Sequence, residues 1–205
     1  MATIYDLKPK FQALLRPICG GLARAGVTAN QVTVAAAALS AAGGGMILWQ
    51  PEARWPLLVL PVVLFLRMAL NAIDGILARE HDMKSRLGAV LNELGDVVAD
   101  AVLYLPLAVV PGVPAWAVAG LVMAGILVEM TGVVGVQIGA SRRYDGPVGK
   151  SYRAFVFSLL AFLLGIGIGA GIWIDILLGL ALVLSGITVI NSARKALAEA
   201  DGSAQ

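Results

Sequence analysis

Apolar stretches long enough to cross a membrane recur along the whole chain, separated by short polar breaks. A transmembrane helix needs about 20 mostly apolar residues. The sequence contains six such stretches, at residues 30–49, 56–79, 87–110, 114–140, 153–171 and 173–194. This pattern predicts an all-α integral membrane protein with six transmembrane helices.

The segment before the first apolar stretch has a different pattern. Residues 5–26, YDLKPKFQALLRPICGGLARAG, alternate basic and apolar residues with a helical rhythm. Such a pattern is typical of an amphipathic helix that lies at the membrane surface. We therefore expect a single membrane domain over 1–205, with a juxtamembrane helix at 1–27, a six-helix bundle at 28–195 and a disordered tail at 196–205.

The composition indicates that the main solvent of this chain is a lipid bilayer. Hydrophobic residues make up 59% of the 205 residues, charged residues only 14%, and the mean hydropathy is +0.86. A soluble domain carries about 25% charged residues, so these values argue against one. The single cysteine, Cys19, has no partner for an internal disulfide and belongs to no metal-binding pattern. The net charge is +2, and no nucleic-acid partner is expected.

The basic residues are distributed unequally between the two sides of the predicted bundle. Of the 15 basic residues, Arg54 lies in a loop on one side and Arg67 lies within the second stretch. The remaining 13 fall on the opposite side. Because basic loops stay in the cytoplasm, this asymmetry predicts cytoplasmic termini in a protein of the bacterial inner membrane.

Small residues fill parts of two stretches, as in AAAALSAAGGG at 35–45 and GIGIGAG at 165–171. Residues of this size let helices approach closely in lipid. We interpret them as packing positions, and whether they also form the face of a homodimer stays open.

Polar side chains interrupt the second and third stretches near the cytoplasmic side. Three- and four-residue spacings place such side chains on one face of each helix, and a short loop would bring the two faces together. The candidate metal ligands are Asn71, Asp74, Asn92, Glu93, Asp96 and Asp100. Their oxygen atoms suit hard divalent cations rather than zinc or copper. Ionisable groups within a membrane are functional by default, so we expect a site here.

The spacing of these residues resembles the signature of the CDP-alcohol phosphatidyltransferase family, D-x-x-D-G-x-x-A-R-x8-G-x3-D-x3-D. The chain carries DGILAR at 74–79, then Gly88 after eight residues, and Asp96 at the last position of the signature. The segment GVTANQVT, at 26–33, looks like the lead into the first membrane helix of that family. The six-span layout with a preceding surface helix is similar too.

The resemblance implies a division of roles among these residues. It implies two divalent cations, Mg²⁺ or Mn²⁺, which grip the pyrophosphate of CDP-diacylglycerol, with Asp74 as a metal ligand. It implies that Asp96 is both a metal ligand and the catalytic base that accepts the proton of the acceptor hydroxyl. The residues implied at the cytidine nucleotide are Asp74, Gly75, Ala78, Arg79 and Gly88.

Two positions depart from the signature. Its first and third aspartates are Asn71 and Asn92 in this chain. An amide oxygen still suits Mg²⁺, but each change removes one negative charge. Glu93 or Asp100, which lie outside the signature, could restore that charge, and the sequence does not decide between them.

A second basic segment follows the fourth stretch and leads into the fifth. It reads SRRYDGPVGKSYRAF, at 141–155. We predict that it binds the acceptor through Arg142, Arg143, Lys150 and Arg153. Guanidinium and ammonium groups bind phosphate well, and this favours a phosphorylated acceptor such as glycerol 3-phosphate.

The sequence therefore predicts a membrane enzyme of phospholipid biosynthesis that moves a phosphatidyl group from CDP-diacylglycerol to a polar alcohol and releases CMP. Two alternatives remain. One is a homologue that has lost catalysis through Asn71 and Asn92 and only binds the CDP-lipid. The other is a small transporter that uses the polar cluster as an ion pathway.

Overall fold

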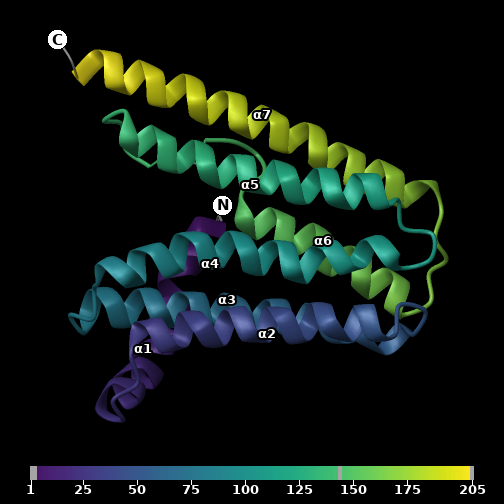
Figure 1. Cartoon of the computed structure of the whole chain (residues 1–205), viewed down its shortest axis with the longest axis horizontal. Coiled ribbons are helices and arrows are strands. Elements are labelled where there is room, and N and C mark those ends of the chain that lie inside the picture. Colours follow the sequence, from purple (N-terminus) through teal and green to yellow (C-terminus); the bar gives the residue numbers. More distant parts are fainter. Residues whose placement is uncertain (1–3, 143–144, 204–205) are drawn as a thin grey trace.

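The computed structural model describes residues 4–142 and 145–203, and these residues form helices and no strand (Figure 1). The elements are α1 (Ile4–Arg24), α2 (Ala29–Trp49), α3 (Arg54–Glu80), α4 (Arg86–Tyr104), the 3₁₀ helix η1 (Leu105–Val109), α5 (Ala115–Gln137), α6 (Lys150–Gly165) and α7 (Ile172–Ser203). Helices α2 to α7 run up and down the long axis of one bundle, joined by short connections (Figure 1). Each predicted stretch corresponds to one α-helix, and the third also includes η1.

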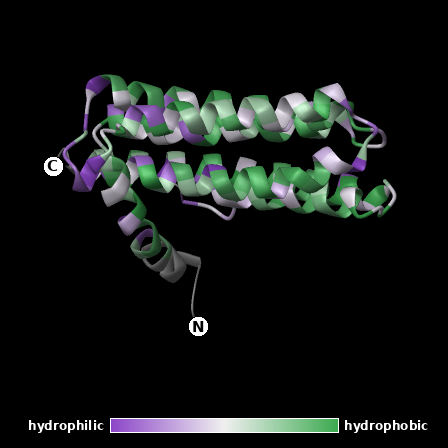
Figure 2. Cartoon of the chain, turned by 90° about the horizontal axis from the view of Figure 1, so that it is seen from below, coloured by the Kyte–Doolittle hydropathy of each residue, from purple (hydrophilic) through white to green (hydrophobic). Residues whose placement is uncertain are grey.

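This alternation brings six helix ends together at one end of the bundle, which we call the site end. The site end holds the starts of α2, α4 and α6 and the ends of α3, α5 and α7. Hydrophilic residues gather there, beside the C-terminus, whereas most of the helical length is hydrophobic (Figure 2). Helix α2 packs against α3 and α4, α6 against α3, and α5 against α7.

Four helices are long and apolar enough to cross a membrane by length and composition. They are α2, α3, α5 and residues 172–202 of α7. Helix α4 has only 19 residues and contains three acids, Glu93, Asp96 and Asp100, and α6 has only 16 residues. The all-helical architecture is thus present, while the number of spans that meet this criterion is lower than the six predicted.

Two boundaries differ from the prediction for physical reasons. The third stretch was expected to continue to 110, but α4 ends at Tyr104 because Pro106 has no N–H to donate to the carbonyl of Val102. The tail was expected to be disordered from 196, but α7 continues to Ser203. Glu199 accepts hydrogen bonds from the backbone and side chain of Ser141, which holds this extension against the α5–α6 connection.

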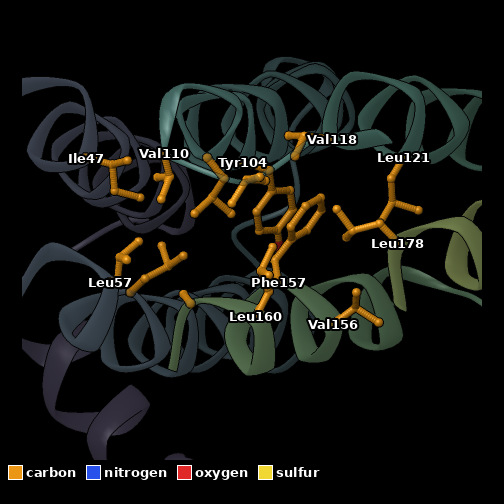
Figure 3. Packing of buried hydrophobic residues seen from close by; sticks show 14 of the residues in the cluster. Ile47, Leu57, Tyr104, Val110, Val118, Leu121, Val156, Phe157, Leu160 and Leu178 are labelled. Atoms are coloured by element: carbon orange, nitrogen blue, oxygen red, sulfur yellow. The ribbon is translucent and has the colours of Figure 1, made fainter. Parts of the chain in front are cut away.

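The main hydrophobic core lies among α2 to α7, and its centre is an aromatic pair. Tyr104 and Phe157 stack with ring centroids 4.3 Å apart, between aliphatic side chains of the surrounding helices (Figure 3). Outside the core, large apolar side chains such as Val62, Phe65 and Met123 are more than half exposed. An exterior of this kind suits lipid and not water.

Helix α1 docks through a second, smaller core and turns away from the bundle axis (Figures 1 and 2). Leu15 and Cys19 are buried against α2 and α3, and burial raises the pKa of the Cys19 thiol. On a different face, Leu14 and Ile18 are 72% and 51% exposed. Helix α1 thus has apolar residues both on the face that packs against the bundle and on an exposed face.

Helix α2 begins at a capping box. Further along, it crosses α4 at close distance. Thr28 accepts from the backbone of Gln31, whose side chain accepts from the Thr28 N–H, which satisfies two N–H groups of the first turn. Further along α2, a Cβ on Gly44 would clash with the backbone carbonyl of Val102 in α4. This is the carbonyl that Pro106 leaves without its helical partner.

We expect Gly44→Ala to lower the free energy of unfolding by about 1–3 kcal/mol relative to Gly45→Ala, because the methyl group forces α2 and α4 apart. Gly45 is a matched control since a Cβ there meets nothing within 4 Å and gains the same helix propensity. Chemical denaturation in mixed micelles measures the difference, and equal stability of the two variants would contradict the close crossing.

Candidate active site

The motif carboxylate on α3, Asp74, is buried at the site end. Its side chain accepts a hydrogen bond of 3.0 Å from the hydroxyl of Thr33 in α2, and it is 4% exposed. Asp96 and Lys150 are the charged side chains that act on it electrostatically. Thr33 is not among the site residues predicted from the sequence, although it lies at the end of the GVTANQVT segment.

The last residue of the motif, Asp96 on α4, is held by two side-chain donors. The amide of Asn71 donates to Oδ1 at 3.1 Å, and Lys150 Nζ lies 2.6 Å from Oδ2. These partners come from α3 and α6, so three helices meet at this carboxylate. The contact between Asn71 and Asp96 joins the first and last positions of the motif.

Asp100 lies one turn further along α4, between two buried arginines. Its Oδ1 pairs with Arg67 of α3 and its Oδ2 lies 3.6 Å from Arg153 of α6. Arg67 also donates to the backbone carbonyl of Asp96 at 3.2 Å. The side chains of Arg67 and Arg153 are only 4% and 2% exposed. The negative charge of Asp100 therefore compensates two guanidinium groups that are buried within the bundle.

The remaining acids continue this ion-pair chain toward the surface. Arg153 donates to Glu129 of α5 at 3.2 Å, and Arg142 lies 3.6 Å from the other oxygen of Glu129. Arg142 also donates to Glu93 at 2.7 Å. Glu93 and Asp100, the two acids outside the signature, are therefore both engaged with arginines. Arg67 and Glu129, the charged residues within α3 and α5, thus pair with Asp100 and Arg153.

The small residues of the predicted nucleotide site make room for their neighbours. A Cβ on Gly75 would lie 3.0 Å from the Arg79 guanidinium, which folds back along α3. A Cβ on Gly88 would lie 2.6 Å from the side-chain oxygen of Asn30, at the start of α2. Ala78 is half-buried and Arg79 is exposed, so the flexible Arg79 side chain is what covers Gly75 on this face of α3.

The residues predicted to bind the acceptor occupy different environments. Lys150 lies next to Asp96 with its side chain 31% exposed. Arg153 is buried in the ion-pair chain, and Arg142 is engaged at its outer end. Arg143 lies outside the described residues. Of the three that the structure describes, Lys150 is the one that contacts a motif aspartate directly.

The donor atoms at the site suit a hard divalent cation. Asp74 and Asp96 offer carboxylate oxygens, and Asn71 and Asn92 offer amide oxygens; Asn92 is half-exposed, one turn before Asp96. Such a set matches the preference of Mg²⁺ for one or two carboxylates completed by water and substrate phosphates. Within the described part of the chain, no three His, Cys, Asp or Glu side chains gather as a metal-binding group.

A small cavity lies behind the carboxylates, among α4, α5 and α6. Its volume is about 10 Å³, and Asp100, Tyr104, Glu129 and Arg153 are among the residues that line it. The Tyr104 hydroxyl and one terminal nitrogen of Arg153 are buried without a hydrogen-bond partner in the structure. The volume matches one water molecule, which would give both groups a partner.

Comparison with known proteins agrees with the fold and the motif. Residues 26–189 match the CDP-alcohol phosphatidyltransferase family, and the chain belongs to this family. It is 44% identical over 197 residues to the inner membrane protein YnbA of Escherichia coli K12, covering 95% of this chain and 96% of that protein. Family membership and the apolar helices identify a membrane transferase of phospholipid biosynthesis.

Solved structures of Mycobacterium tuberculosis phosphatidylinositol phosphate synthase (PgsA1) share the fold. The structure with CDP-DAG bound has a TM-score of 0.74 at 21% identity and covers 88% of this chain and 92% of that chain. The structure with manganese and citrate has the same TM-score and identity, and covers 88% of each chain. At this identity the likeness concerns the fold alone.

We expect Asp100→Ala to lower the free energy of unfolding by about 3–5 kcal/mol, because it removes a carboxylate that two buried arginines share. Asp175→Ala, at the exposed start of α7, is the control and changes the stability by less than about 0.5 kcal/mol. Denaturation in mixed micelles measures both variants. Equal losses for the two would show that Asp100 has no such structural role.

Proposed function

We propose that this protein transfers a phosphatidyl group from CDP-diacylglycerol to a polar alcohol and releases CMP. The observation that carries this proposal is the hydrogen bond between Asn71 and Asp96, because it joins the two ends of the family motif. The exposed Arg79 and Gly75, which follow Asn71 on α3, lie at the same end of the bundle as Asp96. The family and its CDP-DAG-bound structural relative support the donor substrate.

In the proposed reaction Asp96 acts as the general base. Its carboxylate accepts the proton of the acceptor hydroxyl while the alcohol oxygen attacks the lipid-side phosphorus. A new P–O bond forms as the bond from that phosphorus to the bridging oxygen breaks. The electron pair of the broken bond leaves with CMP.

Cationic groups of the chain stabilise the charge of the pyrophosphate in this scheme. Lys150 and Arg79 are the side chains that we assign to its oxygens. A divalent cation, when bound by Asp74, Asp96 and the amide oxygens of Asn71 and Asn92, would add Lewis-acid charge there. The manganese complex of a structural relative supports the use of a divalent cation. Gly75, Ala78 and Gly88 leave space for the nucleotide.

For the acceptor we propose a phosphorylated alcohol, with glycerol 3-phosphate as the first candidate. Lys150 supports this choice because its partly exposed ammonium lies beside the proposed base. Arg142 and Arg153 contribute indirectly, since both are paired with carboxylates that hold the segment in place.

We further propose that all six helices α2 to α7 cross the membrane, with α1 at its surface and the site end in the cytoplasm. Helices α4 and α6 lie alongside the four more apolar helices (Figure 1). The exposed Leu14 and Ile18 give α1 a face for lipid. The basic residues of the site end and the inner-membrane location of the Escherichia coli relative support the orientation.

The direct test is release of CMP from radiolabelled CDP-diacylglycerol by the purified protein, with Mg²⁺ or Mn²⁺ and a panel of alcohols. We expect metal-dependent CMP release with glycerol 3-phosphate or another phosphorylated alcohol. Binding of the lipid without turnover would indicate the homologue that has lost catalysis. Ion flux into liposomes without CMP release would indicate the transporter.

Asp96→Ala and Asp74→Ala should each lower the rate of CMP release by about 10³-fold, because they remove the base or an anionic ligand. The matched control is Asp175→Ala, which removes an exposed carboxylate at the start of α7, at the opposite end of the bundle from the site, and should keep full activity. Gel filtration establishes that each variant is folded. Wild-type rates in either motif variant would refute the role assigned to its residue.

Reporter fusions test the orientation. Green fluorescent protein fused after Gln205 should fluoresce, and alkaline phosphatase at the same place should be inactive, because the site end faces the cytoplasm. Phosphatase inserted in the α2–α3 connection at 50–53 should be active. The reverse pattern would place the motif on the wrong side for a cytoplasmic acceptor.

A further inference from the structure

We propose that Lys150 acts as a built-in cation of this site, in place of one of the two divalent cations implied by the full family signature, and that each chain binds one divalent cation. This inference rests on the proposed function, because it assigns Lys150 to the same pyrophosphate. In this proposal the Lys150 ammonium contacts Asp96 in addition to the phosphate of the acceptor.

The first argument is the charge of the motif. The signature has four aspartates, and this chain keeps two of them, Asp74 and Asp96, with Asn71 and Asn92 at the other positions. The exchange removes two negative charges. Those two charges are what would neutralise one divalent cation. Two divalent cations beside two carboxylates and an ammonium would gather excess positive charge and repel one another.

The second argument is that other acids do not replace the missing charge. Asp100 is paired with Arg67 and lies near Arg153, and Glu93 is paired with Arg142. Together with Glu129, which contacts Arg142 and Arg153, these carboxylates balance the charges of the three arginines. Arg67, which also lies 3.7 Å from Asp96 Oδ1, is balanced by Asp100. The charges that remain at the motif aspartates are therefore those of Asp74, Asp96 and Lys150.

The third argument is the geometry at Asp96. Lys150 Nζ lies 2.6 Å from Oδ2, while the Asn71 amide occupies Oδ1. Side-chain donors thus contact both oxygens of the last motif aspartate. An ammonium has three N–H donors, so two remain for phosphate oxygens.

The fold holds Lys150 in this position from both sides. Before it, the backbone N–H groups of Asp145 and Val148 donate to Ser192 and Thr188 of α7, at 3.0 and 3.1 Å. One turn after it, Arg153 is fixed by Glu129 and lies near Asp100. Because the first turn of α6 is anchored on both sides, the Lys150 ammonium is a preorganised charge and not a mobile surface side chain.

The test is the number of Mn²⁺ ions bound to the full-length protein in nanodiscs, counted by electron paramagnetic resonance as free Mn²⁺ is titrated. The probe is Mn²⁺ alone, so the result does not depend on turnover. We expect one ion per chain. A count of two, or of none, overturns the inference.

Variants identify the contribution of Lys150. In Asn71→Asp/Asn92→Asp the restored aspartates create a second metal site, which Lys150 opposes. Adding Lys150→Met to this pair should tighten the second Mn²⁺ by about tenfold or more, because a like charge a few ångströms away is removed. Adding Lys84→Met, in the exposed α3–α4 connection, should not. Equal affinities with and without Lys150 would overturn the inference.

The single variant Lys150→Met keeps the proposal testable if the combined variants do not fold. It should still bind one Mn²⁺, about tenfold more tightly than the wild type, since the neighbouring ammonium is gone. An unchanged affinity counts against Lys150. One Mn²⁺ per wild-type chain without any CMP release would reject the proposed function alone, and two ions with full CMP release would reject this inference alone.

Discussion

The pairing of Asp100 with two buried arginines is the interaction on which the bundle depends. Arg67 and Arg153 come from α3 and α6, and Asp100 reaches both from α4. An unpaired charge in hydrocarbon is costly, so these helices must stay in register if the charges are to remain compensated. The same register brings Asp96, one turn earlier on α4, to Asn71 and Lys150. A single register of α3, α4 and α6 thus satisfies both the ion pairs of the core and the geometry of the motif.

The polar residues of this chain divide into two shells with different roles. Asp74, Asp96 and their direct partners face the open end, where the motif glycines leave space. Asp100, Glu129 and the arginines lie deeper or further out and bind one another. Such a division explains how a bundle of apolar helices accommodates so many ionisable groups: Asp100, Glu93 and Glu129, which lie beside the motif, are each engaged with an arginine. In the proposed function it is the motif carboxylates, Asp74 and Asp96, that carry the chemistry.

Much of this arrangement follows from the sequence, because the motif spacing fixes which face of each helix carries Asp74 and Asp96. The helix order and the site end also follow, from apolar periodicity and the basic loops. Partner choice does not, since Arg67 and Glu129 are far apart in the chain from Asp100 and Arg153. The end of α4 was readable from Pro106. The continuation of α7 was not, because Glu199 is held by Ser141, a residue 58 positions away.

The salt bridge between Arg16 and Glu80, with two nitrogens donating to one carboxylate at 3.0 to 3.3 Å, ties α1 to the last residue of α3. Arg79 directly precedes Glu80, so the position of α1 along the bundle axis also fixes that of Arg79. In the proposed membrane placement, Leu14 and Ile18 face the acyl chains while Arg16 lies among the headgroups, which holds the Arg79 guanidinium at the water–lipid boundary. A lipid can then present its headgroup there without lifting its tails out of the leaflet.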